Sequence, residues 1–361
     1  PSTPFPDSDG LGPAFNNTSC INCHVRDGRA SFSLAALQAP KGQLTPLGPE
    51  AGIFLRLGLA SPGADAIPTC LPAIGNAFCA PTPVPGFGTQ LFHRGVLGLR
   101  GDSSFSGLAD VYVRFEDKSV SYADGTSVAL SRPVFELHNP WDSPGEVAGD
   151  RPQPLSRLLQ PDVVTSPRNG LPMFGLGLLE AIPEADILVL ADPDDLDGDG
   201  ISGRPNRVHD ALKALRGDAN PISLGRFGWK ASTPSVQIQS ANAYRDDMGI
   251  TNRLFPQESI ADLALYATYR QSHPDDDGQA GLEVSDEVLT VVSFYANTLA
   301  VPARRNVDDP TVLRGATLFE SLKCSSCHHP EFTTGTHPGV WSPQGTVPIP
   351  AVSGQKIHPF S

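Results

Sequence analysis

Two copies of the pattern C-x-x-C-H are the groups of this 361-residue sequence with the clearest chemistry. In this pattern two cysteine thiols form thioether bonds to a haem and the histidine ligates its iron, so one helical turn supplies all three groups. A zinc site would need a second pair of ligands near each C-x-x-C, and a thioredoxin-like dithiol would need a βαβ context; the sequence shows neither. We therefore expect two covalently bound haems, the first held by Cys20, Cys23 and His24 and the second by Cys324, Cys327 and His328.

Each haem iron also has a sixth position, and its occupant decides between electron transfer and peroxide or oxygen chemistry. The sequence contains two methionines, Met173 and Met248. Met248, in the segment DDMGIT, and His358, near the end of the sequence, are the strongest candidates for a sixth ligand. The other histidines outside the motifs, most of which we expect at the surface, are His93, His138, His209, His273, His329 and His337.

An acidic segment at residues 194–206 resembles the start of a calcium-binding loop. Asp195, Asp197 and Asp199 are followed by Gly200, so alternate carboxylates would converge on one hard cation while glycine permits the sharp turn. The twelfth position is Asn206 instead of a bidentate glutamate, which argues against a full helix–loop–helix calcium site. The sequence predicts a bound calcium ion here, and a solvated acidic turn is the alternative.

Periodicity and breaker residues predict the elements that position these groups. Residues 1–30 read as a loop that enters a short helix at the first motif, and residues 52–60 form a short strand or turn. Alternating apolar residues on both sides of the turn signal YADG at 122–125 predict a β-hairpin insertion within residues 109–137. Residues 171–190 predict two short helices separated by a break at Pro183.

Two further helices are predicted before the second motif. In the segment 285–299 the apolar side chains of Val288, Val291, Val292, Tyr295 and Leu299 recur at helical spacing and form one stripe. In the next helix, Asp309 is the expected N-cap with Pro310 at the first helical position, and Val312, Ala316 and Phe319 share a face that leads into the second motif.

Composition and charge exclude several classes of partner. The sequence holds 35 glycines and 36 prolines with 7% aromatic residues, so we expect much loop and little regular strand. Its net charge of −13 argues against a nucleic-acid partner, which would need clustered Lys and Arg, and suits a basic redox protein. No apolar run approaches the roughly 18 residues that a membrane span requires, so we expect no span.

Cysteine usage points to an oxidising compartment. Of the six cysteines, Cys70 and Cys79 remain outside the motifs, in a proline-rich segment, and we expect them to form a disulfide bond. The sequence begins at Pro1 without a basic and then apolar leader, so we expect that any signal peptide has been removed. A periplasmic or extracellular location is therefore expected.

The sequence resembles the bacterial di-haem oxidoreductases, a family also named thiol oxidoreductases and distantly related to the di-haem cytochrome c peroxidases. The resemblance spans nearly the whole chain and is more specific than the haem motifs alone. The stretches that carry it are DGLGPAFNNTSCINCHVRDGRA, YADGTSVALSRP, SPRNGLPMFGLGLLEAIPEADIL, ADPDDLDGDGISGRPNRV, LGRFGWKA, ANAYRDDMGIT, LAVPARR and RGATLFESLKCSSCH.

The resemblance implies a division of labour between the haems. In the peroxidases the N-terminal haem reacts with peroxide, and the C-terminal haem relays electrons from an outside donor, here a small redox protein. Glu180 is the position most similar to their catalytic glutamate, and Gln239 is a weaker match to their glutamine. Trp229 is a candidate for an aromatic bridge between the haems, and a tryptophan buried in a core is the alternative. Those relatives also tend to hold calcium, which supports the acidic loop as a site.

These observations together predict a mainly α-helical fold with extensive loops and two cytochrome c-like haem domains. The first domain, 1–303, is enlarged by insertions that include the small β-hairpin, and the second is 304–361. Family members continue past the segment similar to GQKIHPFS with a stretch that carries the expected sixth ligand of the second haem, so we expect that the sequence is truncated; His358 is the ligand otherwise.

The leading functional prediction is a peroxidase-like oxidoreductase in which electrons enter at the second haem and peroxide or a small substrate reacts at the first. One alternative is a pure electron carrier, in which both irons would be six-coordinate. Another is a haem-dependent oxygenase, by analogy with the more distantly related di-haem rubber oxygenases. A free reactive cysteine that would support the thiol oxidoreductase name is not evident, since all six have other expected roles.

Overall fold

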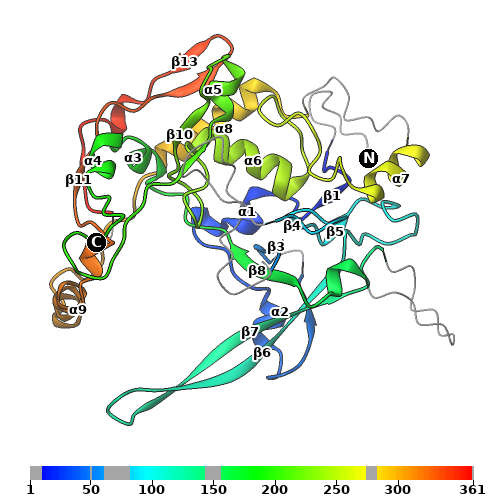
Figure 1. Cartoon of the computed structure of the whole chain (residues 1–361), viewed down its shortest axis with the longest axis horizontal. Coiled ribbons are helices and arrows are strands. Elements are labelled where there is room, and N and C mark those ends of the chain that lie inside the picture. Colours follow the sequence, from blue (N-terminus) through cyan, green and yellow to red (C-terminus); the bar gives the residue numbers. More distant parts are fainter. Residues whose placement is uncertain (1–9, 49–50, 61–81, 143–155, 274–282, 360–361) are drawn as a thin grey trace. The chain divides into compact units, whose positions relative to one another are not determined.

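The computed structural model describes residues 10–48, 51–60, 82–142, 156–273 and 283–359 (Figure 1). The chain forms two compact units, each assembled from segments that are distant in the sequence. Unit 1 comprises Pro1–Thr69, Cys79–Pro172 and Asn242–Ser285, and unit 2 comprises Cys70–Phe78, Met173–Ala241 and Asp286–Ser361. These units reflect packing of the polypeptide, whereas the predicted ranges 1–303 and 304–361 concern haem domains and stay predictions. The expected Cys70–Cys79 disulfide lies outside the described residues.

Unit 1 is built mainly from strands. Its three-stranded sheet β4-β3-β8 is antiparallel, and alternate side chains of β3 enter the core, where Leu55 and Leu57 are 1% exposed. The predicted strand at 52–60 is therefore confirmed. The elements are β1 (Ala14–Phe15), α1 (Cys20–Cys23), α2 (Leu34–Gln38), β2 (Thr45–Pro46), β3 (Ile53–Leu59), β4 (Gln90–Leu91), β5 (Arg94–Gly95), β6 (Asp110–Ser121), β7 (Ser127–His138), β8 (Val163–Asn169) and α7 (Ala264–Ser272).

The predicted β-hairpin is confirmed as β6 and β7, which pair antiparallel over their full lengths and extend as a long twisted ribbon (Figure 1). The turn of the hairpin forms at the predicted YADG segment, residues 122–125. The Asp124 carboxylate accepts hydrogen bonds from the amide and hydroxyl of Thr126, and Gly125 adopts the left-handed conformation that glycine tolerates. Local turn chemistry therefore fixes the register of this hairpin.

Unit 2 contains short helices and three two-stranded sheets among its described residues. Both helices predicted within 171–190 form on either side of Pro183, and the N-cap predicted at Asp309 accepts the Thr311 amide at 2.7 Å. The elements are α3 (Leu176–Glu180), α4 (Glu184–Leu188), β9 (Arg207–His209), α5 (Ala211–Leu215), β10 (Ile222–Leu224), α8 (Asp286–Thr298), α9 (Pro310–Ser321), β11 (Phe332–Thr333), β12 (Val340–Ser342), β13 (Gly345–Val347) and β14 (Lys356–Ile357). Helix α6 (Val236–Met248) begins in unit 2 and ends in unit 1.

Helix α8 is confirmed as an element, but the apolar stripe found in its sequence is not its buried face. Val288 and Val291 are exposed, whereas Leu289, Ser293 and Asn297 are buried. The reason is close packing against α3: a Cβ at Gly177 would overlap the carbonyl oxygen of Asn297, so the two backbones nearly touch. The small side chain of Ser293 and the Asn297 backbone on this face permit that approach, and Val288 and Val291 are left exposed.

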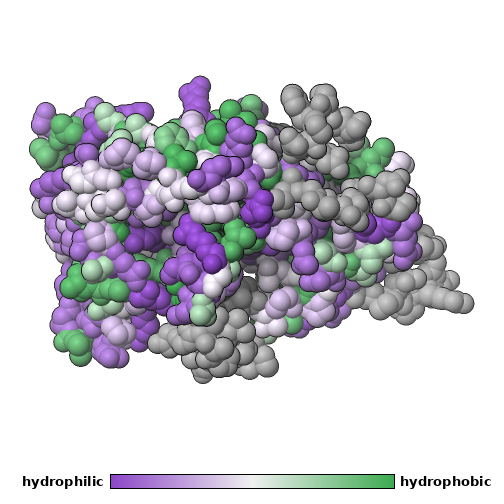
Figure 2. All heavy atoms as spheres, turned by 90° about the horizontal axis from the view of Figure 1, so that it is seen from above, coloured by the Kyte–Doolittle hydropathy of each residue, from purple (hydrophilic) through white to green (hydrophobic). Residues whose placement is uncertain are grey.

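The predicted fold class is wrong, because strands are as prominent as helices in the described residues. The nine α-helices there have at most thirteen residues, while β6 and β7 have twelve each and six small sheets form. Glycine and proline break the helices, yet alternating Val, Tyr and Phe residues still form long strands. No helix in these residues is both long and apolar enough to cross a membrane. On the face seen in Figure 2, hydrophobic residues form small patches among hydrophilic ones.

Candidate functional site

The first C-x-x-C-H motif forms a single helical turn in unit 1. Helix α1 spans the two cysteines, and the His24 amide donates to the Cys20 carbonyl at 2.8 Å. Asn17, which is 1% exposed, anchors this turn: its Oδ1 accepts from the Thr18 amide and the Asn22 side chain, and its Nδ2 donates to a carbonyl in the neighbouring loop. Both thiols and the imidazole are therefore offered from one anchored turn, as attachment of a haem requires.

His24 is oriented as a metal-ligating histidine. Its Nδ1 lies 2.8 Å from the Leu171 carbonyl oxygen, and because a carbonyl only accepts, Nδ1 carries the proton. Nε2 then keeps its lone pair for a metal, an arrangement typical of metal-bound histidines. Burial lowers the pKa of His24, which favours the neutral ligand form.

Glycines allow the chain to lie directly against this motif. A Cβ at Gly52 would come 2.7 Å from the Cys23 Cα, and one at Gly170 would come 3.1 Å from the His24 Cε1. Both separations are shorter than ordinary contacts of side chains, so neither position accommodates a larger residue without displacing the motif. These glycines hold the strand ends of β3 and β8 close to the haem-attachment turn.

The cysteines of this motif are poor nucleophiles. Burial, together with the charges of Asp247 and Cys20, raises the pKa of the Cys23 thiol to about 12. The pKa of Cys20 is also raised. Because the thiolate is the reactive form, thiols of this kind are unsuited to dithiol redox catalysis at neutral pH. The environment agrees with a role in cofactor attachment.

His93 is buried in unit 1, where its Nε2 has no hydrogen-bond partner among the described residues, and the hydrogen bond at its Nδ1 argues against a role as an iron ligand. Asn16 Nδ2 donates to the Leu91 carbonyl at 2.7 Å and also lies 2.9 Å from His93 Nδ1, so this Nδ1 accepts. The proton of the neutral ring therefore sits on Nε2, the nitrogen an iron would need. Met248, also buried in unit 1, stays a predicted sixth ligand.

The second motif lies in unit 2, directly after α9. Cys324 and the two residues after it form a 3-10 turn, and the His328 amide donates to the Cys324 carbonyl at 2.9 Å. Phe319 of α9 lies beside the His328 ring, with 5.9 Å between the ring centroids. None of the α9 side chains is buried, although the helix carries Leu313, Leu318 and other apolar residues.

His358, the candidate sixth ligand of the second haem, belongs to the same unit as that motif. Its side chain is half-exposed, and its Nδ1 lies 3.3 Å from the Pro330 carbonyl and 3.9 Å from a carboxylate oxygen of Glu331. The neighbouring His329 binds the Glu331 carbonyl through its own Nδ1 at 2.8 Å. A role for His358 in iron ligation stays a prediction.

Glu180 ends helix α3 as a buried carboxyl group in unit 2, with 7% of its side chain exposed. Its Oε2 accepts a hydrogen bond from the Val236 amide at the start of α6, at 2.9 Å. Burial raises the pKa of Glu180 to about 7; the Val236 hydrogen bond and the Arg226 charge lower it, and Asp210 raises it. A carboxyl group in this state exchanges protons near neutral pH, which general acid–base chemistry requires.

The Glu180 carboxyl lines a pocket of about 500 Å³ within unit 2. Ionisable side chains of both signs surround it, and a pocket of this size admits a small organic molecule as readily as peroxide. The lining includes Glu180, Glu184, Asp210, Lys213, Arg216, Ser223, Arg226, Gln237, Asn297, Thr336 and Trp341. The pocket is thus a place where a titrating carboxyl group can meet a ligand.

His337 and Asn297, which the sequence did not mark as site residues, lie beside Glu180. His337 has a fully buried side chain, and its Nε2 lies 4.0 Å from Glu180 Oε2 and 3.1 Å from Asn297 Oδ1. Most histidines outside the motifs are expected at the surface; His337 and His93 are the buried exceptions among the described residues. No motif marks His337, because 157 residues separate it from Glu180 and only folding brings them together.

Two further predicted residues of unit 2, Gln239 and Trp229, are not among the residues that line the pocket. Gln239 is half-buried, and its Oε1 lies 3.9 Å from where a Cβ on Gly228 would stand. Its neighbour Gln237, which lines the pocket, exchanges two hydrogen bonds with the backbone of Trp341. Trp229 is 52% exposed, so the alternative of a core tryptophan is wrong, and its role as a bridge between haems stays a prediction.

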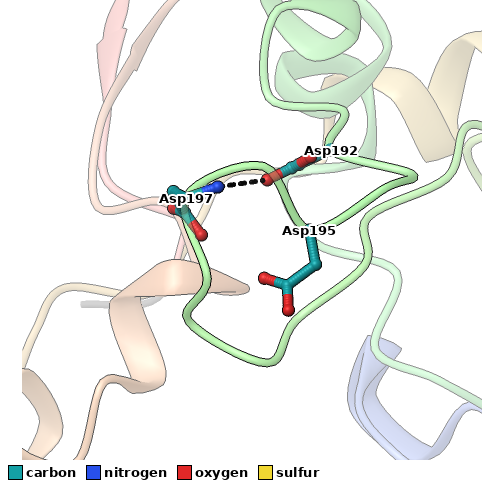
Figure 3. A group of neighbouring side chains, drawn as sticks. All are labelled: Asp192, Asp195 and Asp197. Carbon is teal, nitrogen blue, oxygen red and sulfur yellow. Dashed lines mark hydrogen bonds between the residues drawn. The ribbon is translucent and has the colours of Figure 1, made fainter.

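The acidic loop brings together a different set of aspartates from the one predicted. Asp192, Asp195 and Asp197 each offer a carboxylate oxygen, and these oxygens lie within 4.8 Å of one another (Figure 3). The Asp197 amide donates to Asp192, and the Gly200 amide donates to Asp195. Asp199 lies outside this group and accepts the amide of Ile201 at 2.8 Å. Such oxygen donors suit a hard cation.

Comparison with known proteins assigns the family. The family model described as "Di-haem oxidoreductase, putative peroxidase" matches residues 1–361. No curated protein and no solved structure matches the chain. Membership implies haem cofactors, and the two C-x-x-C-H turns offer the residues to hold them. The chain therefore belongs to the di-haem oxidoreductase family, as the resemblance of its sequence stretches predicted.

Proposed function

We propose that this di-haem oxidoreductase is peroxidase-like, with one haem c bound covalently at each C-x-x-C-H turn. Electrons enter at the second haem from a small redox protein and are used at the first. The observation that carries the proposal is the Glu180 carboxyl, which is buried in a pocket and has a pKa raised to about 7. An electron carrier has no need of such a group, whereas peroxide reduction needs a residue that moves protons.

The attachment residues have separate roles in this proposal. Cys20 and Cys23 hold the first haem and His24 ligates it through Nε2, while Cys324, Cys327 and His328 do the same for the second. When bound, a haem exchanges single electrons, and one whose sixth position is open activates peroxide. The Leu171 carbonyl strengthens His24 as a ligand, because a hydrogen bond from Nδ1–H makes Nε2 more basic.

Glu180 supplies the proton transfer. Reduction of hydrogen peroxide to two waters consumes two electrons and two protons, and a proton must pass from one peroxide oxygen to the other as the bond breaks. A carboxylate accepts that proton and then returns it to the leaving oxygen, which is efficient when the pKa is near the working pH. The Val236 amide and Arg226 favour the charged form of Glu180, so burial does not keep it permanently protonated.

Spin states of the irons test this proposal against an electron carrier. We expect the half-reduced protein to show one high-spin ferric haem that binds cyanide or peroxide and one low-spin haem, because a peroxidase needs an open sixth position. Electron paramagnetic resonance of the resting and half-reduced protein measures this directly. Two low-spin irons that bind neither ligand would identify a carrier. Oxygen consumption with an organic substrate, without peroxide, would identify an oxygenase instead.

We also propose a calcium ion at the acidic loop, held by Asp192, Asp195 and Asp197, with Asp199 supporting the loop. Calcium should bind with 1:1 stoichiometry in calorimetry and stabilise the fold by about 2.7 kcal/mol at a hundredfold excess over Kd. Asp195→Asn should abolish both effects, since it removes one charge from the cluster. Asp186→Asn, an exposed aspartate on α4, is the control. A thermal midpoint that does not change when calcium is added would indicate that the loop is a solvated acidic turn without a bound ion.

The setting of the protein is part of the proposal. A periplasmic or extracellular location agrees with the two C-x-x-C-H motifs and the additional cysteine pair. The net charge of −13 would speed encounter with a basic redox protein at low ionic strength. Electron transfer from a basic cytochrome should therefore slow as salt is added, and a rate independent of salt would contradict this partner.

A further inference from the structure

The hydrogen bonds around His337 fix its tautomer. The Gly339 amide donates to Nδ1 at 2.9 Å, so Nδ1 must accept and the ring proton must sit on Nε2. Nε2 lies 3.1 Å from Asn297 Oδ1, which accepts that proton. The Asn297 amide cannot be reversed, because its Nδ2 already donates to the Ser293 carbonyl at 2.9 Å. His337 is thus a neutral imidazole with one defined N–H.

Protonation of His337 is opposed from two directions. A second proton would have to occupy Nδ1, where it would face the N–H of Gly339. The side chain is also fully buried, and burial lowers the pKa of His337 to about 4. At neutral pH the ring therefore contributes a dipole beside Glu180 and no charge. A cationic histidine at this distance would instead favour the glutamate anion strongly.

We propose that His337 is a positioning residue for Glu180: its Nε2–H, which donates to Asn297 and lies 4.0 Å from the carboxylate, orients Glu180 at the pocket and sets its proton affinity. The distances carry this assignment. Glu180 Oε2 is 4.0 Å from Nε2, which is beyond hydrogen-bond distance, so the Nε2–H acts on the carboxylate as a neighbouring dipole. The inference deepens the proposed function and rests on the acid–base role of Glu180.

Other charged groups also face Glu180. Arg226 favours the anion and Asp210 disfavours it. Glu184 also lines the pocket but forms an ion pair with Arg207 at 2.6 Å. Lys213 and Arg216 of the α5 segment line the pocket as well, and Lys213 donates to the Ile222 carbonyl. Among the described lining residues and their neighbours, His337 is distinguished by a fully buried N–H that donates to Asn297 and lies 4.0 Å from Glu180.

Paired substitutions with opposite expected shifts test the assignment. The probe is the carboxylic acid band of Glu180 in infrared difference spectra of the haem-loaded protein, identified by its loss in Glu180→Gln. His337→Leu removes the N–H and should raise the titration midpoint by about half a pH unit or more. His337→Gln restores an N–H donor and should return the midpoint toward the wild-type value. Asn297→Ala frees Nε2–H for Glu180 and should lower the midpoint.

A control variant, a second test variant and the choice of readout separate this inference from the proposed function. His209→Leu changes an exposed histidine of the same unit and should leave the midpoint unchanged. A wild-type midpoint in folded His337→Leu overturns the inference. If His337→Leu does not fold, an unchanged or raised midpoint in Asn297→Ala overturns it instead. The infrared titration measures the effect of His337 on the titration midpoint of Glu180 even if the protein shows no peroxide turnover. In that case only the proposed function fails.

Discussion

Replacing Glu180 with glutamine is expected to lower peroxide turnover by roughly 10²–10⁴-fold, the usual contribution of a general acid–base group. Glutamine preserves the shape of the side chain and can still accept the Val236 amide, but it cannot take up a proton. Both haems should remain attached and reducible in the variant. Steady-state reduction of hydrogen peroxide with a reduced cytochrome as donor measures the effect, and unchanged turnover would remove Glu180 from the mechanism.

The same variant should be more stable than the wild type at alkaline pH. The pKa of Glu180 is about 7 in the folded protein, above its ordinary value of 4.5, so the folded state binds more protons than the unfolded state between these values. The carboxyl therefore destabilises the fold increasingly as pH rises from about 4.5 to about 7. Thermal midpoints of Glu180→Gln and wild type should converge near pH 4 and separate above pH 7. A variant less stable at every pH would show that its loss of turnover reflects damage to the fold.

The second large effect is expected from the first attachment turn. Replacing Cys20 and Cys23 together with serine should reduce covalent haem from two per chain to one, because both thioether bonds to that haem are lost. Peroxide turnover should disappear, while the remaining haem should still accept electrons from a donor. A pyridine haemochrome assay and the intact mass count the haems. Two haems retained in the variant would contradict the assignment.

The corresponding change at the second turn is the matched control. Replacing Cys324 and Cys327 with serine should also leave one haem, but this variant should keep the high-spin species that binds peroxide. Its turnover with a protein donor should fall, because electrons would have lost their entry point. If instead the first variant keeps peroxide reactivity and the second loses it, the proposed direction of electron flow is reversed.

Elements whose signals are local could be predicted from the sequence. The turn of the β6–β7 hairpin depends on Asp124 and Gly125, which are adjacent to the residues they organise. The start of α9 depends on Asp309 and Pro310, and the break between α3 and α4 depends on Pro183. In each case a side chain or a ring acts on backbone within a few residues.

The buried faces of helices and the fold class could not be predicted, because they depend on packing against segments that are distant in the sequence. The apolar stripe of α8 is a correct helical period, yet Gly177 brings α3 against the opposite face at Asn297 and leaves Val288 and Val291 exposed. The strands of unit 1 form sheets only by pairing segments such as β3 and β8, more than a hundred residues apart. A composition rich in glycine and proline does not indicate which strands will pair.

The features of the candidate site also fall into those that the sequence predicts and those that only the tertiary structure sets. The sequence by itself determined the two attachment turns, since C-x-x-C-H places its thiols and imidazole through the geometry of one helical turn, and it determined the family through stretches spread along the chain. Only the tertiary structure decided that Glu180 is buried beside His337 and Asn297, and that Asp192 joins Asp195 and Asp197. Burial and long-range hydrogen bonds set the proton affinity of Glu180, and both arise only when distant segments pack together.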